Sequence, residues 1–74
     1  MATAAEVKQR IENGIDGASA EVRTDDDVHF TARVVSPAFD GLSLVEQHRL
    51  VYAVFGDGEL GGEIHALSLT TETP

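Results

Sequence analysis

The 74-residue chain contains no cysteine and a single lysine, Lys8. The lack of cysteine excludes disulfide bonds and any thiolate ligand or nucleophile supplied by this chain. The N-terminus has no basic region followed by an apolar run, and no apolar stretch approaches the length of a membrane span. We therefore expect a cytoplasmic protein without a membrane partner.

Basic residues are scarce, with five lysines and arginines against thirteen acidic residues and a formal net charge of −8. Such a surface repels phosphate backbones, because nucleic-acid affinity comes mainly from cations that displace counterions. Acid-rich surfaces also suit high cytoplasmic salt, since a Debye length of about 3 Å at 1 M screens the repulsion between carboxylates. We expect a salt-adapted protein for which nucleic-acid binding is disfavoured.

The length predicts a single domain, residues 1–74, that is monomeric when alone. An apolar share of 42% is enough for one core of helices on a sheet. A deep, enclosed substrate cleft is not expected at this size. The chain also has no nucleophile elbow, triad-like phrase, phosphate-binding loop or dinucleotide fingerprint. These features favour a binding or adaptor module over an enzyme.

The N-terminal half predicts one helix followed by two strands. Thr3 and Glu6 have the spacing of a capping box, and Asn13-Gly14 supplies a left-handed stop, so a helix is expected over about residues 4–13. Apolar and polar residues alternate over 18–23 and again, more clearly, over 29–36, which indicates two strands. The three aspartates at 25–27 form the turn between them and are expected to face water rather than to bind a divalent cation.

The C-terminal half predicts a second helix and a third strand. Ser43 and Glu46 repeat the capping-box spacing. Apolar residues then follow helical spacing as far as Gly56, namely Leu44, Val45, His48, Val51, Tyr52 and Phe55. Residues 57–62 form a turn, and residues 64–70 alternate as a strand. The predicted fold is α+β in the order α-β-β-α-(short turn or helix)-β, a three-stranded sheet with the helices on one face.

Two histidines, His65 and His48, stand at positions that suggest a specific role. His65 stands at the start of the last predicted strand. An imidazole there can extend past the sheet edge and offer a nitrogen, although most histidines at such positions are ordinary surface or boundary residues. His48 shares the apolar stripe of the second helix. We expect it to bond a backbone carbonyl or the turn at 39–43, which would pin the helix. Arg49 follows as a surface cation for an acidic partner or an ion pair.

Several phrases together resemble the BolA-like family. They are the entry to the second strand at His29-Phe30, Val34-Val35-Ser36, Phe39-x-Gly41, His48-Arg49, Ile64-His65-Ala66-Leu67 and Thr73-Pro74. The order and spacing of these phrases match the family over nearly the whole chain. Two departures are a short loop between the first two strands and an end at Pro74, where many relatives add a helix.

The resemblance implies a KH-like type II fold that pairs with a monothiol glutaredoxin across a shared [2Fe–2S] cluster. The glutaredoxin and its bound thiol cofactor supply two sulfurs, and the BolA-like partner supplies imidazole nitrogen, here from His65. The family's second ligand is a histidine or cysteine in a longer loop between the first two strands, and the loop here contains neither. His29 either replaces that ligand, if the short loop carries it towards His65, or is a strand-edge residue.

The resemblance also implies an alternative, because family members are described as transcriptional regulators of morphology and stress responses. A DNA-binding regulator predicts a neutral or basic patch around Arg33 and Arg49. A stand-alone protein-interaction domain predicts instead an exposed apolar face. In every case we expect Phe39, Gly41 and Ser43 to be structural, because they shape the turn that leads into the second helix.

Overall fold

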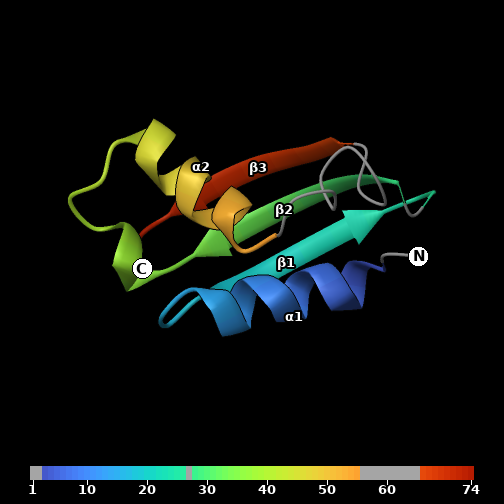
Figure 1. Cartoon of the computed structure of the whole chain (residues 1–74), viewed down its shortest axis with the longest axis horizontal. Coiled ribbons are helices and arrows are strands. Elements are labelled where there is room, and N and C mark those ends of the chain that lie inside the picture. The colour runs from blue at the N-terminus through green and yellow to red at the C-terminus, as the bar shows by residue number, and fades with distance from the viewer. Residues whose placement is uncertain (1–2, 27, 56–65) are drawn as a thin grey trace.

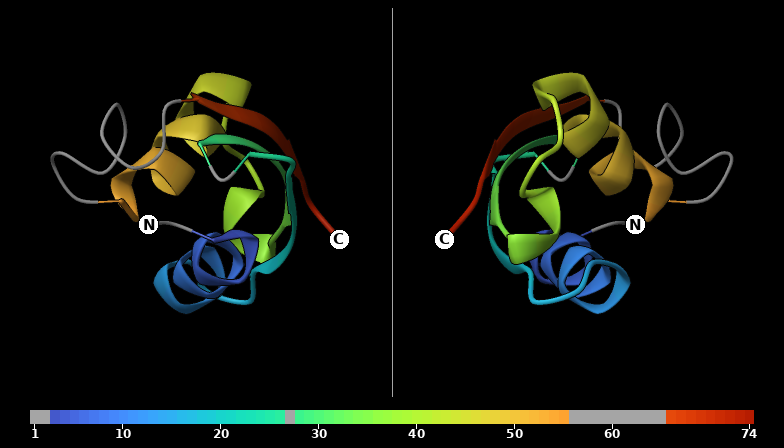
Figure 2. Two further views of the ribbon diagram at one scale, coloured as in Figure 1. Left: turned by 90° about the vertical axis from the view of Figure 1, so that its right-hand side faces the viewer. Right: turned by 90° about the vertical axis from the view of Figure 1, so that its left-hand side faces the viewer.

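The computed structural model describes residues 3–26, 28–55 and 66–74 (Figure 1). Its elements are α1 (Ala4–Gly14), β1 (Ser19–Thr24), β2 (His29–Val35), the short 3₁₀ helix η1 (Pro37–Phe39), α2 (Leu44–Ala53) and β3 (Ala66–Glu72). The sheet has the order β1-β2-β3, antiparallel between β1 and β2 and parallel between β2 and β3. Both helices lie on the same side of this sheet (Figure 2). The predicted α+β fold is confirmed.

The core forms where the helices meet one face of the sheet. Phe30, Ala32 and Val34 alternate along β2 and are at most 2% exposed, as their shared parity predicts. Leu67 and Leu69 of β3 are partly buried against them. The remaining buried hydrophobic side chains come from both helices, β1 and the turns, namely Val7, Ile11, Ile15, Ala20, Phe39, Val51 and Phe55.

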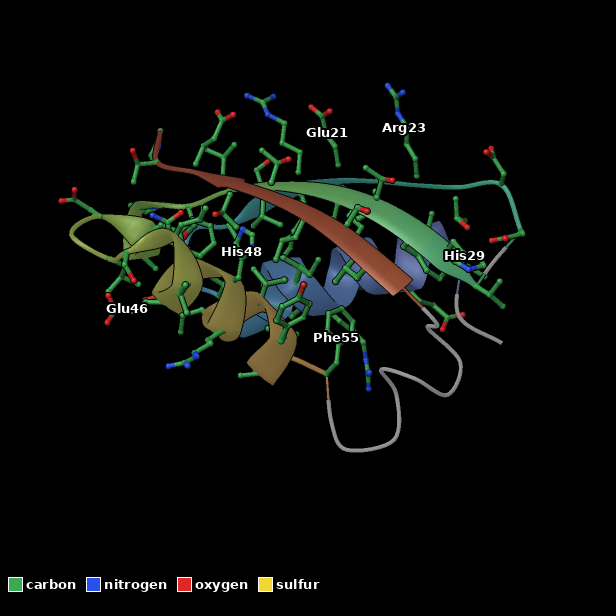
Figure 3. The ribbon with its side chains drawn as sticks, turned by 90° about the horizontal axis from the view of Figure 1, so that it is seen from above. Glu21, Arg23, His29, Glu46, His48 and Phe55 are labelled. Carbon is green, nitrogen blue, oxygen red and sulfur yellow. The ribbon has the colours of Figure 1, made fainter. Side chains whose placement is uncertain are left out.

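The other face of the sheet is open to solvent and polar. Glu21 and Arg23 of β1 point away from the helices, whereas His48 and Phe55 lie on the helix side (Figure 3). In the strand register, Glu21 is opposite Arg33, and Arg23 is opposite Thr31. Opposite charges therefore alternate on this face, which a sheet covered on only one side can present to water.

α1 begins as predicted but ends differently. The side chain of Thr3 accepts a hydrogen bond from the Glu6 N–H at 3.2 Å, which is one half of the predicted capping box. The helix continues through Gly14, and the first described glycine with a positive φ is Gly17, at 65°, so the predicted left-handed stop at Gly14 is wrong. Gly14 has a packing role instead, because a Cβ there would lie 2.8 Å from a methyl carbon of Val54. The end of α1 thus approaches the end of α2 too closely for a side chain.

α2 carries the complete capping box. The Ser43 hydroxyl accepts from the Glu46 N–H at 3.2 Å, and the Glu46 carboxylate accepts from the Ser43 N–H at 2.9 Å. The helix ends at Ala53, earlier than predicted, and the Phe55 N–H then bonds the Tyr52 carbonyl in a tighter turn. Neither α1 nor α2 is long and apolar enough to cross a membrane.

The predicted apolar stripe of α2 is only partly buried. Val51 and Phe55 are in the core, but Leu44 and Val45 are 61% and 59% exposed. Both stand in the first turn, and among the described elements α2 packs mainly against β3. Tyr52, another member of the stripe, is 37% exposed. The helical spacing of apolar residues therefore does not place Leu44, Val45 and Tyr52 in the core.

Ser36 and the short helix η1 form the corner between β2 and α2. The fully buried Ser36 hydroxyl donates to the Asp16 carbonyl at 2.6 Å and accepts from the Ala38 N–H at 3.0 Å. Phe39 is fully buried, and Gly41 has a φ of 78°. Ser36 therefore caps η1 instead of ending the strand, and the turn before α2 needs a glycine.

Candidate metal-ligand site at the start of β2

The turn between β1 and β2 is organised by Asp26. Its Oδ1 accepts hydrogen bonds from the backbone N–H groups of Val28, at 3.0 Å, and His29, at 2.9 Å. The Thr24 hydroxyl donates to the His29 carbonyl at 2.7 Å, which ties the end of β1 to the start of β2. Asp26 is therefore a structural acceptor, and the expectation that this acidic run only faces water is wrong for it.

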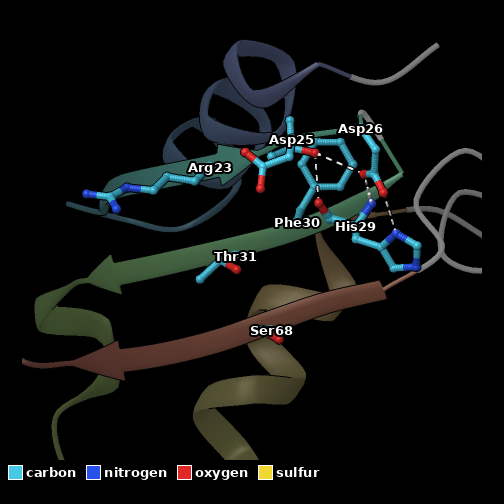
Figure 4. A pocket seen from close by; sticks show the side chains of 8 residues that line it. Arg23, Asp25, Asp26, His29, Phe30, Thr31 and Ser68 are labelled. Carbon is cyan, nitrogen blue, oxygen red and sulfur yellow. Dashed lines mark hydrogen bonds and ion pairs between the residues drawn. The ribbon is translucent and has the colours of Figure 1, made fainter.

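The same carboxylate holds the imidazole of His29. Its Oδ2 lies 2.7 Å from Nδ1 of His29, and the two side chains are 48% and 64% exposed (Figure 4). The His29 amide, the His29 imidazole and the Val28 amide hold the pKa of Asp26 well below its ordinary value. A charged carboxylate and an oriented, accessible imidazole thus stand together at the beginning of β2.

A surface hollow lies beside this pair. Its lining includes Arg23, Asp26, His29, Thr31 and Ser68 (Figure 4). These residues come from all three strands and the turn, and the hollow opens on the face of the sheet that the helices leave free. A single sequence segment does not reveal such a site, because its lining depends on the strand register.

The parallel pairing of β2 and β3 places their beginnings at one end of the sheet. His29 is the register partner of Ala66. His65, the predicted ligand, lies outside the described residues, and so does the predicted turn at 57–62. Among the described residues, no group of three or more histidines, aspartates and glutamates could by itself hold a metal ion.

His48 has a different environment from the one predicted. Its Nε2 is buried without a hydrogen-bond partner among the described residues, and its ring meets Tyr52 edge-on at 6.5 Å between centroids. Its neighbour Gln47 makes the predicted type of contact instead. Gln47 donates to the Leu42 carbonyl at 3.0 Å and accepts from the Thr71 hydroxyl at 2.6 Å. The expected hydrogen bond from His48 is therefore wrong, and Gln47 ties α2 to the preceding turn and to β3.

Arg33 and Arg49 do not form one surface. Arg33 lies on the open face of the sheet and bonds Glu72 through Nη2 at 2.8 Å and Nε at 3.4 Å. This pairing raises the pKa of Arg33 and lowers that of Glu72. Arg49 is exposed on α2, which covers the opposite face, beside Glu46 and Leu50. Within the described residues, Arg33 and Arg49 therefore do not contribute to a single patch of the kind that a DNA-binding regulator would present.

Comparison with protein families decides where this chain belongs. Residues 5–74 match the family model described as "BolA-like protein". The chain belongs to the BolA-like family. The match includes both the turn that carries Asp26 and His29 and the phrase that contains His65.

Known relatives and solved structures agree with this membership. The BolA-like chain is 48% identical over 52 residues to the protein BOLA1 of Arabidopsis thaliana chloroplasts and 48% identical over 48 residues to human BolA-like protein 1. These alignments cover 70% and 65% of this chain but only 32% and 34% of those proteins. A bolA protein homologue from Coxiella burnetii superimposes with a TM-score of 0.86 at 40% identity, covering 100% of this chain and 94% of that one.

Sequence reasoning about this BolA-like protein missed the role of Asp26. A signal for it was present, because an aspartate followed closely by a strand entry commonly accepts backbone N–H groups two or three residues further on. The adjacent Asp25 concealed this signal, because the sequence does not show which of the two aspartates accepts the amides. In the structure, Asp25 makes no hydrogen bond with a described residue. Only the path of the turn distinguishes the two.

Proposed function

We propose that this BolA-like protein is an adaptor in iron–sulfur cluster assembly, trafficking or sensing that holds a [2Fe–2S] cluster jointly with a monothiol glutaredoxin. His65 and His29 would supply imidazole nitrogens, and the glutaredoxin with its thiol cofactor would supply the sulfurs. The protein acts in this proposal by binding and presenting a cluster, and catalyses no reaction itself.

The observation that carries the proposal is the arrangement at the start of β2. His29 is accessible and oriented by Asp26, and its partner in the parallel register is Ala66. His65 directly precedes Ala66 in the sequence. Ala66, the residue that follows His65 in the sequence, therefore begins β3 at the same end of the sheet as His29, and this supports the proposal that the two histidines serve one cluster.

The donor chemistry of the chain fits a shared cluster. A [2Fe–2S] cluster is held by thiolates, or by imidazoles in place of the two thiolates on one iron. The chain has no cysteine, so its sulfur ligands must come from elsewhere. When bound in this way, the cluster would provide one-electron chemistry at a potential above that of an all-thiolate centre.

The test is to mix the protein anaerobically with cluster-loaded monothiol glutaredoxin and to record visible circular dichroism. We expect a spectrum distinct from that of the glutaredoxin alone. His65→Ala should abolish it while folding is retained, because alanine offers no lone pair and residue 65 precedes the described strand β3. His29→Ala should weaken it if His29 is the second ligand.

The control is His48→Ala, because His48 is half-buried on α2 and is not proposed as a ligand. This variant should lose stability but form the mixed cluster. An unaltered spectrum from His65→Ala would contradict the proposal, and unfolding of that variant would indicate that His65 is structural.

A further inference from the structure

The carboxylate of Asp26 controls both the backbone and the side chain of His29. Oδ1 accepts the amides of Val28 and His29, and Oδ2 contacts Nδ1 of the ring. Because one rigid carboxylate makes both kinds of contact, the ring is held relative to the first residues of β2. The Thr24 hydroxyl on the His29 carbonyl restrains the same residue from the side of β1.

The contact between Asp26 and His29 also decides where the proton lies on the ring. A carboxylate can only accept, so the hydrogen in the 2.7 Å contact belongs to Nδ1. A neutral imidazole has one N–H, and its Nε2 then keeps the lone pair. Histidines that bind metals commonly donate their other N–H to a carboxylate in this way, which fixes the tautomer and the ring orientation.

We propose that Asp26 is the positioning residue of the site: it selects the Nδ1–H tautomer of His29 and presents Nε2 as the metal-binding nitrogen. This inference rests on the proposed function, because it specifies how His29 takes part in the shared cluster. It also gives the short loop between β1 and β2 a purpose. The loop supplies the residue that prepares a ligand at the start of the strand.

The contacts of Asp26 indicate a supporting role and not that of a ligand. Its two oxygens together accept three hydrogen bonds from Val28 and His29. These contacts occupy three of the roughly four acceptor positions of the carboxylate. His29 offers a ring on a side chain that is 64% exposed, so the metal-facing group of the pair is the imidazole.

The tautomer can be measured in the free protein, without cluster or partner. Long-range ¹H–¹⁵N correlation spectra of histidine-labelled protein, recorded at mildly alkaline pH where imidazoles are neutral, should show His29 mainly as the Nδ1–H form. In Asp26→Asn the amide oxygen can still accept the two backbone amides, but its NH₂ group donates to Nδ1. The proton should then move to Nε2, and the Nε2–H form should dominate.

The cluster measurement completes the test. Asp26→Asn should weaken retention of the mixed cluster with glutaredoxin by about 10- to 100-fold, the usual effect of losing a supporting partner of a metal ligand. The matched control is Asp25→Asn, which removes the same charge one residue away and breaks no hydrogen bond with a described residue. It should change neither the tautomer nor cluster retention.

Several results would overturn the inference. They are a dominant Nε2–H form in the unmodified protein, an unchanged tautomer in Asp26→Asn, or equal weakening of the cluster by the variants at 25 and 26. If Asp26→Asn moves the proton to Nε2 as expected but retains the mixed cluster normally, the ligand role of Nε2 is refuted, while the adaptor function stands. Failure of the unmodified protein to form any mixed cluster would refute the proposed function, and the ligand role with it.

Discussion

At the scale of single residues, Gln47 and His48 show how neighbouring polar side chains on one helix can have opposite roles. Gln47 satisfies both ends of its amide, through the Leu42 carbonyl and the Thr71 hydroxyl. The buried Nε2 of His48 has no partner among the described residues and contributes through the contact of its ring with Tyr52. A buried polar atom without a partner costs about 1–3 kcal/mol. His48 therefore stabilises α2 by its shape and not by its polarity.

Replacing His48 with phenylalanine tests this distinction. The substitution removes the unpartnered nitrogen and keeps an aromatic ring that can meet Tyr52 edge-on. We expect the free energy of unfolding in urea to stay the same or to rise by up to about 1 kcal/mol. Gln47→Ala is the comparison, and it should lower that free energy by about 1–2 kcal/mol through the loss of two hydrogen bonds. A clear loss of stability in His48→Phe would mean that Nε2 has a stabilising partner.

At the scale of elements, the two helices depend on different contacts. α1 buries Val7 and Ile11 and is tied to β1 by Glu12, which accepts from Lys8 Nζ at 2.8 Å and from the Ala20 N–H at 3.0 Å. The Lys8 and Ala20 contacts lower the pKa of Glu12. Lys8 also donates to the Ala20 carbonyl, so both backbone groups of Ala20 on the outer edge of β1 are satisfied. This arrangement blocks part of an edge that could otherwise pair with another strand.

α2 depends more on its capping box, because its first turn is exposed. Ser43→Ala should lower the free energy of unfolding by about 1 kcal/mol, since the Glu46 N–H loses its acceptor. Chemical or thermal unfolding measures the change. Ser19→Ala, an exposed serine on β1, is the control and should have a much smaller effect. Equal stability of the Ser43 variant and the unmodified protein would show that the cap contributes nothing.

At the scale of the whole molecule, charge is the dominant feature. Thirteen acidic residues face five basic ones. Among the ion pairs between described residues, Lys8 is paired with Glu12 and Arg33 with Glu72. Exposed pairs of this kind contribute little each. The remaining negative charge repels itself across a body with a radius of gyration of 11.4 Å.

Stability should therefore rise with salt, because added ions screen this repulsion. The midpoint of urea unfolding should increase from low to molar potassium chloride. The triple variant Asp16→Asn, Asp25→Asn, Asp40→Asn removes three exposed carboxylates that form no ion pair with a described residue. It should show a shallower increase. Midpoints that fall with salt would argue against salt adaptation.

Much of the fold could be predicted from local patterns. The face of β2 that enters the core follows from the parity of Phe30, Ala32 and Val34, and the start of α2 follows from the spacing of Ser43 and Glu46. Both features depend on residues close together in the sequence. The family could also be predicted, because its phrases keep their order and spacing along the chain.

The sequence by itself thus determined the element types, the core face of β2 and the absence of any thiolate. The tertiary structure decided the parallel pairing that sets His29 against Ala66, the close approach of Gly14 to Val54, and the choice of Asp26 over Asp25 as the partner of His29. The physical reason is the sequence separation over which each kind of interaction acts. Periodicity and capping act within a few residues, whereas hydrogen-bond partners and ligand geometry depend on where distant segments meet.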